Sequence, residues 1–314
     1  MTESTQRVSA SSQTGSIYDL GYRRYEGPRL GRGYAVRALA LDSLRTAYGI
    51  GHGGRAKIAP IVFGAIAILP AIIVVGFLAL ASRLGARAEL ESASPITYDS
   101  YYSSITAVIT LFCAAQAPEL FSRDQRHGVI ALYFARALRR ADYAVARLAG
   151  FGVALLILLL LPMLILLIGR VLLSTDVAAA FGDDLPKLPA VVAQALVIAG
   201  LFGSLSMAVS AFTPRRAYAI AGIIALFLIP GIVAGIAIGV ETSGSGTSGT
   251  IGNLLVLLSP GTILDGTSAL FFGKDLPEEL AFFDLPMWTF LASAVLITAV
   301  ATVLTVRRFV RMST

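Results

Sequence analysis

Residues 119–148 read ELFSRDQRHGVIALYFARALRRADYAVARL and separate two long apolar runs of the chain. We name residues 119–148 the charged insert, and its composition favours helix. The insert contains six arginines, at positions 123, 126, 136, 139, 140 and 147, against three acids, Glu119, Asp124 and Asp142. Because arginine and lysine are enriched in the cytoplasmic segments of membrane proteins, this excess predicts that the insert lies in the cytoplasm.

The composition indicates an integral membrane protein. Of the 314 residues, 56% are hydrophobic and 14% are charged, and the mean hydropathy is +0.77. The formal net charge of +6 arises from basic residues beside apolar runs, so we expect contact with membrane lipids and no nucleic-acid partner. The single cysteine, Cys113, cannot form an intramolecular disulfide, and its apolar neighbours predict a buried side chain with no metal to bind.

Six apolar segments are long enough to cross the bilayer, which takes about 20 helical residues. The predicted fold is therefore an all-α polytopic membrane protein with six transmembrane helices in one domain, residues 58–314. The six predicted spans are residues 58–82, 98–118, 149–169, 188–212, 217–240 and 287–306.

Two regions precede the first span. Residues 1–32 begin with a polar, Ser/Thr-rich stretch and are predicted to be a disordered cytoplasmic segment. Residues 33–57 contain a helical pattern in which Tyr34, Ala38, Leu41 and Tyr48 share a stripe, followed by a glycine-rich linker. The helix is short and carries three charges, so we predict that it lies in the plane of the membrane interface.

Polar residues mark the second span and the segment between the fifth and sixth spans. Ser103, Thr106 and Thr110 make the second span less apolar than the others, and they are candidates for lining a cavity. The alternative is that they pack against neighbouring helices. Residues 241–286 are predicted to form short outer helices, interrupted at Ser-Pro-Gly 259–261.

The basic residues predict the orientation of the chain. An even number of spans places both termini on one side, together with the charged insert and the turn at 213–216. Twenty of the 25 lysine and arginine residues fall on that side. Both termini are therefore predicted to be cytoplasmic.

The sequence lacks the motifs of an energy-converting enzyme. It contains no G-x-x-x-x-G-K-[ST] phosphate loop, and the central apolar stretches of the spans contain no ionisable residue. A proton relay or an ion-coupled carrier needs such residues at depth. We therefore expect no catalytic residue, no metal and no cofactor on this chain.

Residues 117–143, APELFSRDQRHGVIALYFARALRRADY, resemble the coupling region of ABC-2 type transporter permeases. The resemblance covers an acid at the end of the second span, a basic-acidic pair, a glycine, a short apolar helix and a basic-aromatic exit. These features are Glu119, Arg123-Asp124, Gly128, residues 130–134, Arg136, Arg139-Arg140 and Tyr143. Ala137 stands where a proline is common in that family. The order of spans and the inside termini extend the resemblance over essentially the whole chain.

The resemblance implies a membrane subunit of a bacterial ABC exporter in the plasma membrane. Two such permeases, identical or paralogous, would pair with two ATP-binding subunits that carry the ATP and magnesium. The coupling helix implied to dock on the ATPase contains Glu119, Arg123, Asp124, Arg126, His127, Gly128 and Tyr133. The neighbouring connecting helix contains Tyr34, Arg37, Leu41 and Arg45.

Two alternatives remain open from the sequence. The charged residues at 119–127 also fit an ordinary solvated inner loop, and the whole chain also fits a non-transporting scaffold for a cytoplasmic partner. For a transporter, the absence of ionisable groups at depth favours a hydrophobic or amphipathic cargo such as a drug, antibiotic, peptide or lipid-like molecule.

Overall fold

The computed structural model describes residues 27, 30–51, 53–84, 97–134, 138–174, 176–243 and 249–312, and all regular structure within them is helical. The expected disorder of residues 1–32 falls almost entirely outside this part of the chain. So do Arg136 and Ala137, and nothing tests what the resemblance implied for them.

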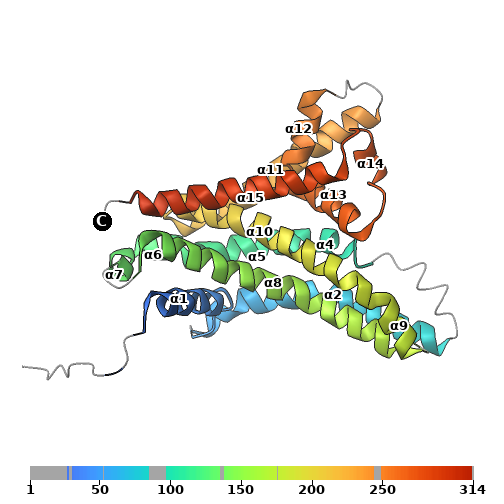
Figure 1. The fold of residues 1–314 in the computed structure, drawn as a ribbon, viewed down its shortest axis with the longest axis horizontal. Coiled ribbons are helices and arrows are strands. Elements are labelled where there is room, and N and C mark those ends of the chain that lie inside the picture. Colours follow the sequence, from blue (N-terminus) through green and yellow to red (C-terminus); the bar gives the residue numbers. More distant parts are fainter. Residues whose placement is uncertain are drawn as a thin grey trace, which may run out of the picture.

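Five long helices form the body of the molecule and lie side by side in Figure 1. Each is long and apolar enough to cross a bilayer, and they correspond to the first, third, fourth, fifth and sixth predicted spans. The shortest, of 24 residues, is about 36 Å long at 1.5 Å per residue. They are α2 (Gly54–Arg83), α8 (Arg140–Leu172), α10 (Leu188–Phe212), α11 (Arg216–Thr242) and α15 (Met287–Val310).

The second predicted span is divided. It consists of α4 (Tyr101–Ser104) and α5 (Thr106–Leu120), separated at Ile105. The N–H of Ile105 donates to the carbonyl of Tyr101 (3.3 Å) and the N–H of Ile109 donates to that of Ile105 (3.0 Å), so the helical ladder continues through the break. The α5 helix alone has 15 residues, fewer than a span requires. Cys113 on α5 is fully buried, as predicted.

Short helices occupy the far end of the bundle. The α12 helix (Thr250–Leu258) meets α13 (Pro260–Phe272) at an angle of 87°. The change of direction falls at Ser259-Pro260, where proline occupies the first position of α13, the place in a helix where its missing N–H costs no internal hydrogen bond. The α14 helix (Glu278–Ala281) follows, and α9 (Val177–Asp184) with the 3₁₀ helix η1 (Leu185–Lys187) leads into α10.

The first helix, α1 (Arg32–Ala47), lies along the beginning of α8 (Figure 1). Arg32, where α1 begins, binds Asp142, and the Tyr48 hydroxyl just beyond its end donates to the carbonyl of Ala154 (2.8 Å). Both ends of α1 therefore contact α8, and the position of the helix in the plane of the membrane interface stays a prediction.

The face of α1 that packs differs from the predicted stripe. The buried residues are Leu39, Ser43 and Ala47, whereas Tyr34 and Leu41 are 57% and 54% exposed. Tyr34 and Leu41 therefore do not pack on α8, and their place at the membrane interface stays a prediction. Close contact with α8 is made by the small residues Ala40 and Ser43, opposite Gly150.

The contact at Gly150 generates the first testable prediction. A methyl group at this position would lie 2.4 Å from the carbonyl oxygen of Ala40, whereas one at Gly152, on the same helix, would meet nothing within 4 Å. We expect Gly150→Ala to lower the free energy of unfolding by about 1–3 kcal/mol relative to Gly152→Ala. Unfolding with a denaturing detergent, followed by circular dichroism, measures the difference. Equal stabilities would contradict the close packing of α1 on α8.

Candidate functional site at the insert

The charged insert contains two short helices between α5 and α8, at the end of the bundle that also holds α1 and the C-terminus (Figure 1). They are α6 (Ser122–Arg126) and α7 (Ile130–Phe134). Gly128, with φ +66°, reverses the chain between them in a conformation that side chains disfavour. The predicted coupling helix from Arg123 to Tyr133 is thus two helices with a turn.

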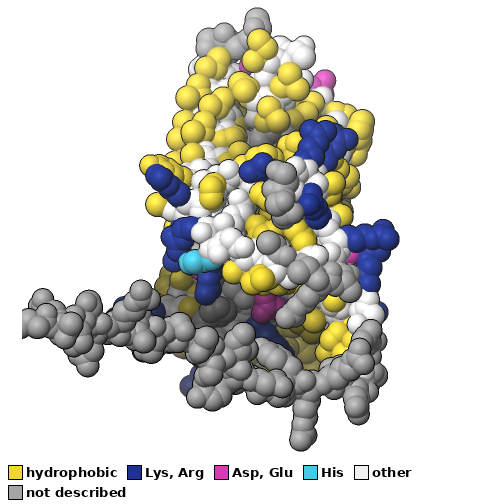
Figure 2. Space-filling model, turned by 90° about the vertical axis from the view of Figure 1, so that its left-hand side faces the viewer, with side chains coloured by type: hydrophobic (Ala, Val, Ile, Leu, Met, Phe, Trp, Pro, Cys, Tyr) yellow, Lys and Arg dark blue, Asp and Glu magenta, His cyan; other side chains and the backbone are white. Residues whose placement is uncertain are grey.

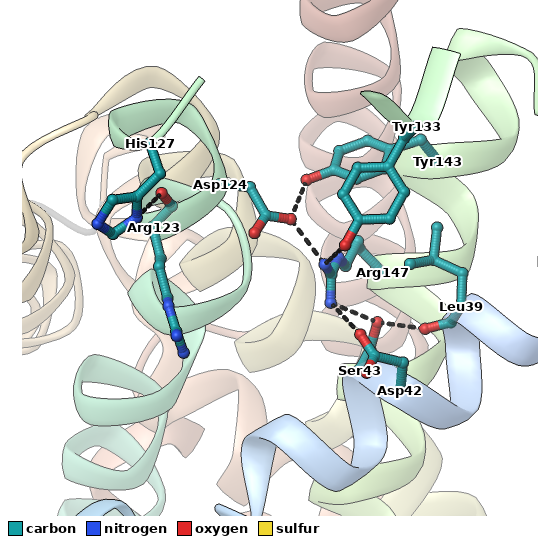
Figure 3. A network of polar contacts seen from close by, with 9 residues as sticks. All are labelled: Leu39, Asp42, Ser43, Arg123, Asp124, His127, Tyr133, Tyr143 and Arg147. Atoms are coloured by element: carbon teal, nitrogen blue, oxygen red, sulfur yellow. Dashed lines mark hydrogen bonds and ion pairs between the residues drawn. The ribbon is translucent and has the colours of Figure 1, made fainter. Parts of the chain in front are cut away.

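The side chain of Arg147, on α8, joins the insert to α1 (Figure 3). One terminal nitrogen, Nη2, donates to Asp124 Oδ2 (2.6 Å) and to the Tyr133 hydroxyl (3.2 Å). The other, Nη1, donates to Asp42 Oδ2 (3.2 Å) and to Ser43 Oγ (3.3 Å). We name this set, with Tyr143, the Arg147 cluster, and it connects α1, α6, α7 and α8.

Burial makes the Arg147 cluster sensitive to the loss of any one of its charged partners. The side chain of Arg147 is 3% exposed and that of Asp124 is 12% exposed. The hydroxyl of Tyr143 donates a second hydrogen bond to Asp124 Oδ2 (2.7 Å). Removing one partner of such a pair leaves a buried charge without its counter-ion, a change that destabilises proteins by about 3–5 kcal/mol.

Further contacts hold α6 against the ends of α10 and α11. Ser122 Oγ donates to the carbonyl of Thr213 (2.6 Å), and Gln125 Nε2 donates to that of Ala211 (2.9 Å). The last carbonyls of a helix lack partners within the helix, so α6 caps the end of α10. Arg216, where α11 begins, pairs with Glu119 at 2.8 Å.

The end of α15 is fixed to the insert as well. Arg140 Nη1 donates to the carbonyls of Met312 (2.5 Å) and Val310 (3.3 Å) and lies over the ring of Phe134. Phe309 packs against Phe121 and Tyr143, with ring centroids 4.6 and 5.2 Å apart. The insert therefore binds the near ends of α8, α10, α11 and α15.

One face of the insert remains exposed. Arg123, Arg126 and His127 are exposed, and Leu132 on α7 is 69% exposed. Figure 2 shows lysine and arginine side chains gathered on this end of the molecule, with a histidine among them. Figure 3 shows Arg123 and His127 pointing away from Arg147. This cationic face can bind an acidic surface.

The structure divides the predicted docking residues into two groups. Arg123, Arg126, His127 and Gly128 face outward, whereas Asp124 lies inside the Arg147 cluster and Glu119 and Tyr133 are partly buried. The predicted connecting-helix residues Tyr34, Arg37, Leu41 and Arg45 are all exposed on α1.

Sequence reasoning missed the central residue of the site. Arg147 was counted only as part of the charge excess, and Asp42 and Ser43 were not selected. The available signal was an arginine just before the most apolar run of the chain and four residues after Tyr143, hence on the same face of one helix.

Of the three candidate cavity residues, two line a cavity and one does not. Thr106 and Thr110 line an apolar cavity of about 530 Å³ between α5, α10, α11 and α13, with Phe202, Phe227 and Gly231 in its walls. The Thr106 hydroxyl donates to the carbonyl of Tyr102 on α4, and the Thr110 hydroxyl donates to that of Thr106 on α5. Ser103 instead donates to Asp265 Oδ1 (2.6 Å), which joins α4 to α13. In the described residues no group of three or more His, Cys, Asp or Glu side chains could hold a metal ion.

The bundle of long apolar helices, with the charged insert bound to the helix ends on one side, defines a multi-pass membrane protein. The family model described as ABC-2 family transporter protein matches residues 59–314, and the chain belongs to that family. The chain is therefore a membrane subunit of a transporter. A comparison with curated proteins found no match.

The Arg147 cluster generates the second prediction. We expect Arg147→Met to lower the free energy of unfolding by about 3 kcal/mol, because Asp124 then stays buried without its cation. Arg126→Met, at an exposed position of the same insert, should change it by less than about 1 kcal/mol. Detergent-induced unfolding measures both.

A double-mutant cycle tests whether Asp124 is the stabilising partner of Arg147. The combined variant Asp124→Leu with Arg147→Met should lose less stability than the two single variants added together, because no unpaired charge remains. Additive losses would show that Asp124 and Arg147 do not stabilise each other.

Proposed function

We propose that this protein is the permease subunit of an ATP-driven exporter whose ATP is hydrolysed by a separate subunit. The observation that carries the proposal is the insert itself. It presents an exposed cationic face, Arg123, Arg126 and His127, on a support bound to α1, α8, α10, α11 and α15. A partner that binds this face would push or pull on five helices together.

The proposed assembly contains two ATP-binding subunits, which hold ATP and magnesium, and a second permease that is either another copy or a paralogue. The insert and both termini would lie in the cytoplasm of a bacterial cell, in keeping with the excess of arginine on that side. The six-span topology requires α4 and α5 to cross as one segment, and the continuous hydrogen bonds at Ile105 support this.

The proposed cargo is hydrophobic or amphipathic. The cavity lined by Thr106 and Thr110 has aromatic and aliphatic walls, and the hydroxyls of both threonines already donate to backbone carbonyls four residues earlier. An apolar wall of this kind favours a drug-like, peptide-like or lipid-like molecule over an ion. Export is the direction expected of the family.

Loss of the cationic face should uncouple the complex. We expect Arg123→Ala with Arg126→Ala to weaken binding of the cognate ATPase roughly thirtyfold, because two charge pairs of about 1 kcal/mol each are removed. Co-purification and the ATPase rate in proteoliposomes measure the effect, and Arg83→Ala, at the opposite end of α2, is the control. Unchanged binding and transport would remove the docking role of the insert. A stable complex with a partner that binds no nucleotide would favour the scaffold instead.

Filling the apolar cavity should reduce transport without loss of assembly. Gly231 lines the cavity and Gly235, one turn further along α11, does not, and a methyl group at either meets nothing within 4 Å. We expect Gly231→Leu to lower export of hydrophobic cargo several-fold and Gly235→Leu to leave it near wild type. Equal transport by the two variants would place the cargo elsewhere.

A further inference from the structure

A second cavity at the insert end is polar and basic. It has a volume of about 500 Å³ and lies between the end of α1, the beginning of α2, the end of α5, α6 and the beginning of α11. Three arginines from three different helices line it, namely Arg55, Arg123 and Arg216, together with Glu119 and Gln116.

The charges in this cavity do not cancel. Arg216 pairs with Glu119 at 2.8 Å, so these two side chains are neutral together. Arg55 and Arg123 are exposed to the cavity and the solvent, and neither forms an ion pair with another described residue. The cavity therefore carries an excess of two positive charges, which favours an anionic occupant.

Gln116 adds a polar side chain to the wall of the cavity. Its residue is 4% exposed, and its amide forms no hydrogen bond within the described part of the chain. Its amide atoms are not among the fully enclosed side-chain atoms of the described residues that lack a partner, so they face the open space of the cavity. A ligand that accepts from this amide would take the place of water there.

The beginning of α2 adds further donors. This 30-residue helix starts after Gly53, with no side-chain cap on its first N–H groups. Gly53 and Gly54 leave these groups open, since a methyl group at either would meet nothing within 4 Å. Unpaired N–H groups at the start of a long helix attract anions, above all phosphate.

The wall of the cavity continues into an apolar stripe. Arg55, Ala59, Val62 and Ile66 recur at helical spacing on one side of α2, and Val62 and Ile66 are 44% and 46% exposed. A ligand with its charged group at Arg55 could therefore lay hydrocarbon chains along α2.

We propose that this cavity binds the phosphate headgroup of an anionic phospholipid from the leaflet at the insert end. Arg55, Arg123 and the Gln116 amide bind the phosphate, while the acyl chains lie on Val62 and Ile66. The bound lipid bridges α2, α5 and α6, so it stabilises the insert against the bundle. The proposal rests on membrane embedding and this cavity, not on transport.

The test is lipid binding to the purified full chain. Native mass spectrometry after titration with phosphatidylglycerol or phosphatidylcholine should show one retained phosphatidylglycerol per chain and at least tenfold weaker retention of phosphatidylcholine. Arg55→Gln with Gln116→Leu should reduce retention of phosphatidylglycerol roughly tenfold, because a charge-assisted bond and a neutral bond are lost. Arg55→Lys should restore most of the preference, and a wild-type circular dichroism spectrum shows that each variant is folded.

Arg307→Gln, which removes an exposed arginine near the end of α15 outside the cavity, is the matched control and should bind as the wild type does. Equal retention of the two lipids, or unchanged binding by the Arg55→Gln and Gln116→Leu variant, would overturn the proposal. Displacement of the lipid by millimolar inorganic phosphate, with phosphate alone giving the same thermal stabilisation, would assign the cavity to a soluble anion and overturn it as well.

Discussion

A guanidinium group that leaves water must meet opposite charge and hydrogen-bond acceptors at close range, and at Arg147 this constraint fixes where four helices meet. The group is 3% exposed and sits just before the apolar part of α8. Asp124 reaches it from α6, Tyr133 from α7, and Asp42 with Ser43 from α1. Neither α6 nor α7 is long enough to be stable by itself, since isolated helices of five residues do not persist in water. Their positions therefore depend on this cluster and on the helix ends that they cap.

The position of α1 depends on a steric requirement as well as on the hydrogen bonds to Arg147. The α1 helix can present Ser43 and Asp42 to Arg147 only because Gly150, one turn further along α8, allows the two backbones to approach closely. Small residues at a helix contact give van der Waals packing where lipid supplies little hydrophobic driving force. Charge pairing selects the partners of Arg147, and Gly150 sets the distance between α1 and α8.

The apolar runs predicted the long helices well, because a segment that must satisfy its backbone inside a bilayer has little choice but a helix. The sequence also indicated the short helices of residues 241–286 and the break at 259–261. It did not predict the packing face of α1, since large apolar residues such as Tyr34 and Leu41 can face lipid as readily as protein. It could not pair Arg147 with Asp124, 23 residues away, or with Asp42. Such pairing depends on how separate helices are arranged, and periodicity within one helix contains no information about that arrangement.

A buried ion pair contributes little net stability compared with well-packed apolar residues, so its value lies in geometry. Among the described residues Arg147 Nε has no hydrogen-bond partner, so the cluster does not use every donor of the guanidinium. The cluster instead fixes the position of α6 relative to α8, because a shift of either helix would break the 2.6 Å hydrogen bond between Arg147 and Asp124. A displacement of α6 would therefore move α8 and α1 with it, as long as the bonds of the cluster are kept. In the proposed function this is the property a coupling element needs, because a force applied to Arg123 and Arg126 reaches the membrane helices only if the insert and α8 move as one body.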